Sequence, residues 1–102
     1  MKMLIITSIR EDLRAVSRIM DKAGIEVFSV SETIGHKTAF HQFMPDNWFG
    51  KSDDGTEALF FFSFTQNDYA KKAIGLVKDF NKESKVNFPI RAFLLPVEEA
   101  SY

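Results

Sequence analysis

The sequence has no cysteine, three prolines, five glycines and a formal net charge of only −1 over 102 residues. Without cysteine there are no disulfides, thiolate catalysis, iron–sulfur clusters or cysteine-ligated zinc sites, which fits a reducing compartment such as the cytoplasm. The near-zero net charge argues against nucleic-acid binding, because a nucleic-acid-binding protein needs basic surface to neutralise phosphates. The apolar run at 3–6 is too short for a signal sequence or a membrane span. We therefore expect a cytoplasmic protein with no nucleic-acid partner and no membrane insertion.

The chain is instead rich in hydrophobic residues, at 45%, and it contains eleven phenylalanines. Its length is enough for one domain, residues 1–102, with a core that needs no disulfide or metal. The periodicity of the hydrophobic residues predicts the order β-α-β-β-α-β. The four strands are expected at 3–7, 25–33, 58–64 and 89–95.

Two helices are predicted from apolar residues at helical spacing. The first begins with a capping box from Ser8 to Glu11 and ends at Gly24. The second begins at Asn67 and gives way to a polar connection at 81–87. Their expected buried stripes are Leu13, Val16, Ile19, Met20 and Ala23 in the first helix, and Ala70, Ala73, Ile74, Val77 and Phe80 in the second.

This order predicts an α+β fold, the ferredoxin-like split βαβ sandwich. It has a four-stranded antiparallel sheet with the first and third strands central, two helices on one face and a long loop between the second and third strands. Both central strands are apolar on both sides, and two helices cover only one side of a sheet. A second copy of the protein is the expected cover of the other side. The alternative is that the loop and the C-terminal tail fold over it.

Two stretches carry a resemblance to a known family. Gly24-Ile25-Glu26 followed by Val30-Ser31-Glu32 and Gly35, and the stretch Phe93-Leu94-Leu95-Pro96-Val97-Glu98-Glu99, resemble motifs of the PII signalling (nitrogen regulatory protein P-II) family. The resemblance implies a trimeric signal-transduction protein whose sheets face inward. It implies that about residues 35–57 form a T-loop that docks on a partner protein, either a transporter or a metabolic enzyme. It further implies a small-molecule site at the cleft between subunits.

The family's ligand is an adenine nucleotide, held by a glycine-rich turn before the fourth strand. Here that stretch is NKESKVNFP at 81–89, and no glycine follows Gly75. The arginines that follow the glutamate pair in the family are also missing, because only Ala100 and Ser101 separate that pair from Tyr102. We therefore predict that adenine nucleotide is not bound in the usual manner, and the sequence requires no cofactor.

Other residues remain as ligand candidates. We expect the ligand to contact Gly35, His36 and Lys37 at the loop base, with Lys85 and Arg91 opposite.

Aromatic residues in the long loop mark a candidate partner surface, because exposed aromatics are enriched at interfaces. This surface would consist of Phe40, Phe43, Trp48, Phe49 and Lys51. The same residues could instead form a lid over the cleft, or pack onto their own or a neighbouring subunit.

Two other functions remain open. His36 and His41 could ligate a metal, since imidazole suits zinc, copper or nickel. In that case the chain would be a metal-responsive protein resembling the divalent-cation tolerance family. The other alternative is an interaction domain without a small ligand. No catalytic triad, Walker loop, zincin motif or dinucleotide-binding motif is present. We therefore predict that the protein is not an enzyme and has no catalytic residues.

Overall fold

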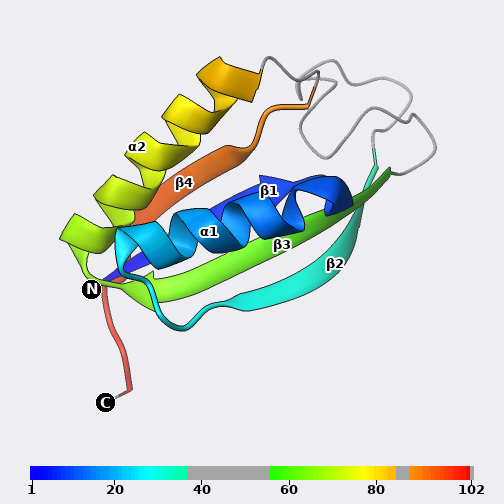
Figure 1. The fold of residues 1–102 in the computed structure, drawn as a ribbon. Helices are drawn as coiled ribbons and strands as arrows, with labels where there is room; N and C mark the ends of the chain where they lie inside the picture. The colour runs from blue at the N-terminus through cyan, green and yellow to red at the C-terminus, as the bar shows by residue number, and fades with distance from the viewer. Residues whose placement is uncertain (37–55, 85–87, 102) are drawn as a thin grey trace.

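The computed structural model describes residues 1–36, 56–84 and 88–101. In chain order the elements are β1 (Lys2–Ser8), a 3₁₀ turn η1 (Arg10–Asp12), α1 (Leu13–Ala23), β2 (Ser29–Gly35), β3 (Thr56–Thr65), α2 (Asn67–Ser84) and β4 (Arg91–Pro96). The strands form one sheet, and both helices cover the same face of it (Figure 1).

The strand order across the sheet is β2-β3-β1-β4, and every neighbouring pair is antiparallel. β3 therefore lies between β1 and β2, and β1 lies between β3 and β4. The α+β prediction is confirmed, because this arrangement is compatible with the ferredoxin-like split βαβ fold. The predicted central position of the first and third strands is confirmed as well.

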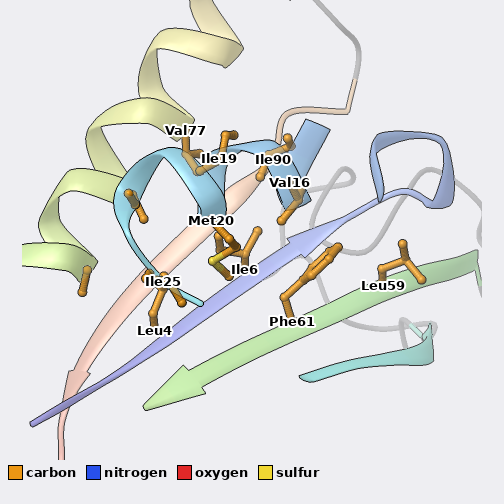
Figure 2. Close-up of a cluster of buried hydrophobic side chains, with 13 residues drawn as sticks. Leu4, Ile6, Val16, Ile19, Met20, Ile25, Leu59, Phe61, Val77 and Ile90 are labelled. Carbon is orange, nitrogen blue, oxygen red and sulfur yellow. The ribbon is translucent and has the colours of Figure 1, made fainter. Parts of the chain in front are cut away.

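The core fills the space between the two helices and the sheet (Figure 2). Leu4 and Ile6 of β1 and Phe61 of β3 are completely buried there, together with Met20 of α1. Burial of one such side chain stabilises the fold by about 1.5–3 kcal/mol. The predicted stripes are largely confirmed, because Val16, Ile19, Met20, Ala23, Ala70, Ala73 and Val77 are buried, and Ile74 and Phe80 pack against the same cluster.

The start of the first helix differs from the prediction. Ser8 belongs to β1 and pairs with Leu59, so its backbone is committed to the sheet. Its hydroxyl donates to the carbonyl oxygen of Ile9 at 3.0 Å, and no capping box forms. The η1 turn comes next and delays α1 to Leu13, whose side chain is 41% exposed and not buried as predicted. The predicted stop is confirmed, because Gly24 ends α1 in the left-handed conformation with φ of 87°.

The second helix is longer than predicted, because α2 continues to Ser84. Asn81 was expected in the connection but lies in the last turns of α2. Its side-chain amide nitrogen donates to the carbonyl oxygen of Ile90 at 2.8 Å, and its Oδ1 accepts from the Ile90 N–H at 2.9 Å. This amide thus holds the end of α2 against the residue before β4.

The second strand begins later than predicted. β2 starts at Ser29, and residues 25–28 form a connector in which Ile25 is buried in the core. The Ser63 hydroxyl donates to the carbonyl oxygen of Val27 at 2.7 Å and holds this connector against β3. Within residues 1–36, 56–84 and 88–101, no helix is both long and apolar enough to cross a membrane.

Candidate functional site

The sheet face opposite the helices carries aromatic side chains along β3. Side chains alternate between the two faces of a strand. Because Leu59 and Phe61 point into the core, Phe60, Phe62 and Phe64 lie on the opposite face. Their ring centroids are 5.9 Å apart for the first pair and 6.3 Å apart for the second. These three rings therefore form a continuous row, which we call the aromatic row.

The register of the sheet places further apolar residues beside this row. Phe64 is opposite Met3, which is opposite Leu95, and Phe62 is opposite Ile5, which is opposite Phe93. Phe64 is 55% exposed and Leu95 is 40% exposed. An apolar band therefore crosses β3, β1 and β4 on the face that lacks helices. Exposed apolar surface of this kind marks an interaction site.

The same face becomes polar toward the β2 edge and toward one end of the sheet. Ser29, Ser31 and Thr33 of β2 lie on this face, opposite Phe62, Phe60 and Ala58 respectively. At the end of β1, Thr7 is opposite Phe60 on one side and Arg91 on the other. The apolar band is therefore bordered by hydroxyl groups along one edge and at one end.

The structure places three of the predicted ligand residues at that same end. Gly35 is the last residue of β2, opposite Thr56, and the exposed His36 follows it directly. Arg91 is the first residue of β4. β2 and β4 are the two outer strands, about three strand spacings or roughly 14 Å apart. One chain therefore does not bring Gly35 and His36 together with Arg91.

The other predicted site residues lie outside the described part of the chain. These are Lys37, Phe40, His41, Phe43, Trp48, Phe49, Lys51 and Lys85. Their assignments as ligand, metal or partner residues stay predictions. Among residues 1–36, 56–84 and 88–101, no group of three or more histidine, cysteine, aspartate or glutamate side chains could hold a metal ion.

An ion-pair cluster that the sequence analysis missed lies on the helix side of the same sheet end. Arg10 of η1 donates to Glu32 of β2 and lies 3.7 Å from Glu57 of β3. The hydrogen bond to Glu32 and the charge of that carboxylate raise the pKa of Arg10, with a further contribution from Glu57. All three side chains are largely exposed, so the cluster adds little stability. Its geometry links η1 to both strands that flank the segment 36–55.

Asp12, at the junction of η1 and α1, is a second polar feature that the sequence did not reveal. Its Oδ2 atom is buried without a hydrogen-bond donor. Burial raises the pKa of this carboxyl group, and the neighbouring charge of Glu11 raises it further. In the sequence, Asp12 is one of two adjacent acidic residues at a helix start, and only the three-dimensional structure distinguishes it from Glu11.

No protein-family model matches the sequence, and no curated protein matches it either.

Proposed function

We propose that this chain is a PII-like regulatory protein that works in the cytoplasm as a homotrimer. In this proposal it senses a small molecule at the cleft between subunits. It controls a partner protein, a transporter or a metabolic enzyme, through the loop of about residues 35–57.

The observation that carries the proposal is the apolar face of the sheet. The aromatic row and its neighbours on β1 and β4 form a band that the helices leave uncovered. Phe64 at 55% exposure is far more accessible than a large aromatic residue inside a core. A trimer with inward-facing sheets would bury this band, as the motifs in 24–35 and 93–99 imply.

The positions of the ligand candidates fit a site shared between subunits. Gly35 and His36 lie at one edge of the sheet and Arg91 at the other, but all three lie at the same end. In a cyclic assembly, the β2 edge of one copy can lie beside the β4 edge of the next copy. The two half-sites then complete one cleft, at the point where the loop begins.

The control mechanism is a population shift. A ligand that binds one arrangement of the loop base better than another changes the fraction of molecules in that arrangement. A partner that recognises this arrangement is then bound more tightly. Arg10 connects η1 to the strands on both sides of the loop, so its ion pairs with Glu32 and Glu57 belong to the same loop base.

The assembly is tested by light scattering after size-exclusion chromatography. We expect the mass of three chains for the wild type and of one chain for Phe62→Lys, because a charge in the middle of the apolar band opposes its burial. The control is Leu13→Lys, which adds the same charge at a 41% exposed position of α1 and should stay trimeric. A monomeric wild type would contradict the proposal.

The sensing step is tested by a thermal-shift screen of the wild type with ATP, ADP, AMP, cyclic nucleotides, bicarbonate, 2-oxoglutarate and divalent metals. We expect stabilisation by at least one small molecule, and its reduction in both His36→Ala and Arg91→Ala. A shift with metals alone, lost in His36→Ala but retained in Arg91→Ala, would favour the metal-responsive alternative. The absence of any shift would contradict sensing and favour an interaction domain without a small ligand.

A further inference from the structure

The groove beside Tyr69, about 570 Å³ in volume, includes Phe64 of the aromatic row in its wall. It therefore belongs to the face that the proposed assembly buries. A second groove, of about 280 Å³, lies between α1 and α2, and we call it the helix groove. Because the helices cover the face of the sheet opposite to the apolar band, covering the band leaves the helix groove open to solvent (Figure 1).

The helix groove exists because the two helices diverge. They are close where α1 ends and α2 begins, since a Cβ atom at Gly24 would lie 3.3 Å from the Tyr69 ring. Small buried side chains at Ala23, Ala70 and Ala73 allow this close approach. Figure 1 shows α2 turning away from α1 toward its C-terminal end. The groove lies between these diverging parts of the helices.

The floor of the helix groove is apolar. Ile19 of α1 is buried in the core, and Leu76 and Phe80 of α2 pack against the same cluster but stay partly exposed. Ala15 completes this surface with only a methyl group. The volume of 280 Å³ is just below the range of about 300–1,000 Å³ that is usual for drug-sized ligands. A small metabolite with an apolar part therefore matches the groove in size and surface.

The walls of the helix groove carry opposite charges. Arg18 and Lys22 belong to α1, and Asp79 and Glu83 belong to α2. All four side chains are exposed, and none of them forms an ion pair with another residue in the described part of the chain. Each wall also places two like charges four positions apart on one helix, which slightly destabilises that helix. The cationic and anionic walls therefore do not neutralise each other.

This arrangement selects a ligand by the position of its charges and not by its net charge. An anion is attracted by one wall and repelled by the other, and the same holds for a cation. A neutral molecule leaves both walls unpaired. A zwitterion with an apolar side chain fits all three surfaces, because each charged group meets the wall of opposite sign and the side chain covers the floor.

We propose that the helix groove binds a free α-amino acid with an apolar side chain. Its carboxylate pairs with Arg18 and Lys22. Its ammonium group pairs with Asp79 and Glu83, and its side chain packs on Phe80. The site goes beyond the proposed function, since it requires neither the trimer nor the ligand of the cleft between subunits.

The test uses two-dimensional NMR of the full ¹⁵N-labelled chain, titrated with L-leucine. We expect saturable amide shifts concentrated at 15–22 and 76–83. Three probes each lack one part of leucine: 4-methylpentanoate lacks the ammonium group, 3-methylbutylamine lacks the carboxylate, and glycine lacks the side chain. Each should bind at least about fivefold more weakly. If either single-charge probe binds as tightly as leucine, or if leucine causes no saturable shift in the two ranges, the proposal is overturned.

The two walls are tested separately by removing one charge from each. We expect Arg18→Gln to weaken leucine binding about fivefold without weakening the binding of 3-methylbutylamine, which has no carboxylate. Glu83→Gln should weaken leucine binding to a similar extent without weakening the binding of 4-methylpentanoate. Arg14→Gln and Asp68→Asn are matched controls, because they remove the same charges from exposed helix positions that do not line the groove. Equal effects of the wall and control variants would overturn the assignment.

A second copy of the chain is the competing occupant. Two grooves related by a two-fold axis parallel to the helices would place each basic wall against an acidic wall. Dilution of the protein without leucine distinguishes the two occupants. Amide signals at 15–22 and 76–83 that move on dilution would show a second copy there and overturn the proposal, whereas signals that stay fixed until leucine is added support it.

Discussion

The side chain of Asn81 forms two hydrogen bonds with the backbone of a single residue, at the point where α2 meets β4. A side-chain amide carries an NH₂ donor group and a carbonyl acceptor, so it can pair with both the C=O and the N–H of one backbone residue. Asn81 uses both, because its amide nitrogen and its Oδ1 bond the carbonyl and the N–H of Ile90 at 2.8 and 2.9 Å. The side chain of Ile90 is buried in the core, so this contact also positions a core residue.

We expect Asn81→Ala to lower the free energy of unfolding by about 2–3 kcal/mol. The substitution removes two hydrogen bonds and leaves both backbone groups of Ile90 without these partners in a part-buried place. Urea denaturation followed by circular dichroism measures the change. Lys82→Ala, at the exposed neighbouring position of the same helix, is the control and should change stability by less than about 0.5 kcal/mol. Equal stabilities of the two variants would contradict this role of Asn81.

Asp12 makes the opposite contribution, because its carboxylate is partly buried and its Oδ2 has no donor. Its pKa is raised above the ordinary value of 3.8, so the folded state favours the protonated form. Below pH 3.8 the carboxyl is protonated in both the folded and the unfolded state, so the stability contribution of the protonated side chain is fully present. It is lost as the pH rises through the raised pKa.

We therefore expect Asp12→Asn to stabilise the protein at pH 7, where the wild type carries a buried charge. The gain should shrink as the pH falls toward 3.8 and the wild-type carboxyl becomes protonated in the folded state. Urea denaturation at pH 7.5 and pH 4.5 measures the difference. The control is Glu98→Gln, which removes a carboxylate at an exposed position of the tail and should change stability by less than about 0.5 kcal/mol. A gain that is larger at pH 4.5 than at pH 7.5 would show that the sign is wrong.

Among the elements, the two glycines in the described helical regions have opposite roles. Gly24 ends α1 with φ of 87°, and a Cβ atom there would lie 3.3 Å from the Tyr69 ring. Gly75 lies inside α2, and a Cβ atom there would meet nothing within 4 Å. One glycine is therefore required by the backbone conformation, whereas the other only lowers helix propensity.

We expect Gly24→Ala to destabilise the protein by about 1–2 kcal/mol, because alanine is strained in the left-handed region and its methyl group presses on Tyr69. Gly75→Ala should stabilise it by about 0.5–1 kcal/mol through helix propensity. Thermal unfolding of both variants beside the wild type measures the two shifts. The same sign for both would contradict the assignment.

Sequence patterns predicted the elements well where burial decides them. Apolar residues at helical spacing located α1 and α2, and the doubly apolar stretches located the central strands β1 and β3. The predicted helix boundaries were wrong where contacts between residues far apart in the sequence determine them. Pairing with Leu59 held Ser8 in the sheet and prevented the capping box, and the contact with Ile90 went together with a helix that extends past Asn81.

For the candidate site, the sequence predicted the uncovered apolar face, because strand alternation follows directly from residue order. It placed Gly35 and Arg91 in one cleft only through the family resemblance, and within one chain they lie on opposite edges. The contact of Arg10 with Glu32 had no local signal. These residues are 22 positions apart, and only the strand order makes them neighbours.

The whole molecule has a different potential contact at each end of its sheet and on its open face. The end with Gly35 and Arg91 carries the proposed ligand residues, and the other end carries the groove beside Tyr69. Between them, the apolar band runs along β3 and across β1 and β4. Assembly through the band would bury Phe64, which also lines the groove at the second end, so that groove is not independent of the assembly.

If the band holds three copies together, unfolding also separates them, so stability must depend on protein concentration. For a trimer, a hundredfold dilution removes about 2 kcal/mol per protomer, which lowers the unfolding midpoint by several degrees in a domain of this size. Differential scanning calorimetry across that range measures the slope. Phe64→Lys, at the exposed end of the aromatic row, should abolish the slope, whereas Leu13→Lys should retain it. A wild-type midpoint that does not change on dilution would contradict a trimer held together by the band, because a folded monomer unfolds independently of concentration.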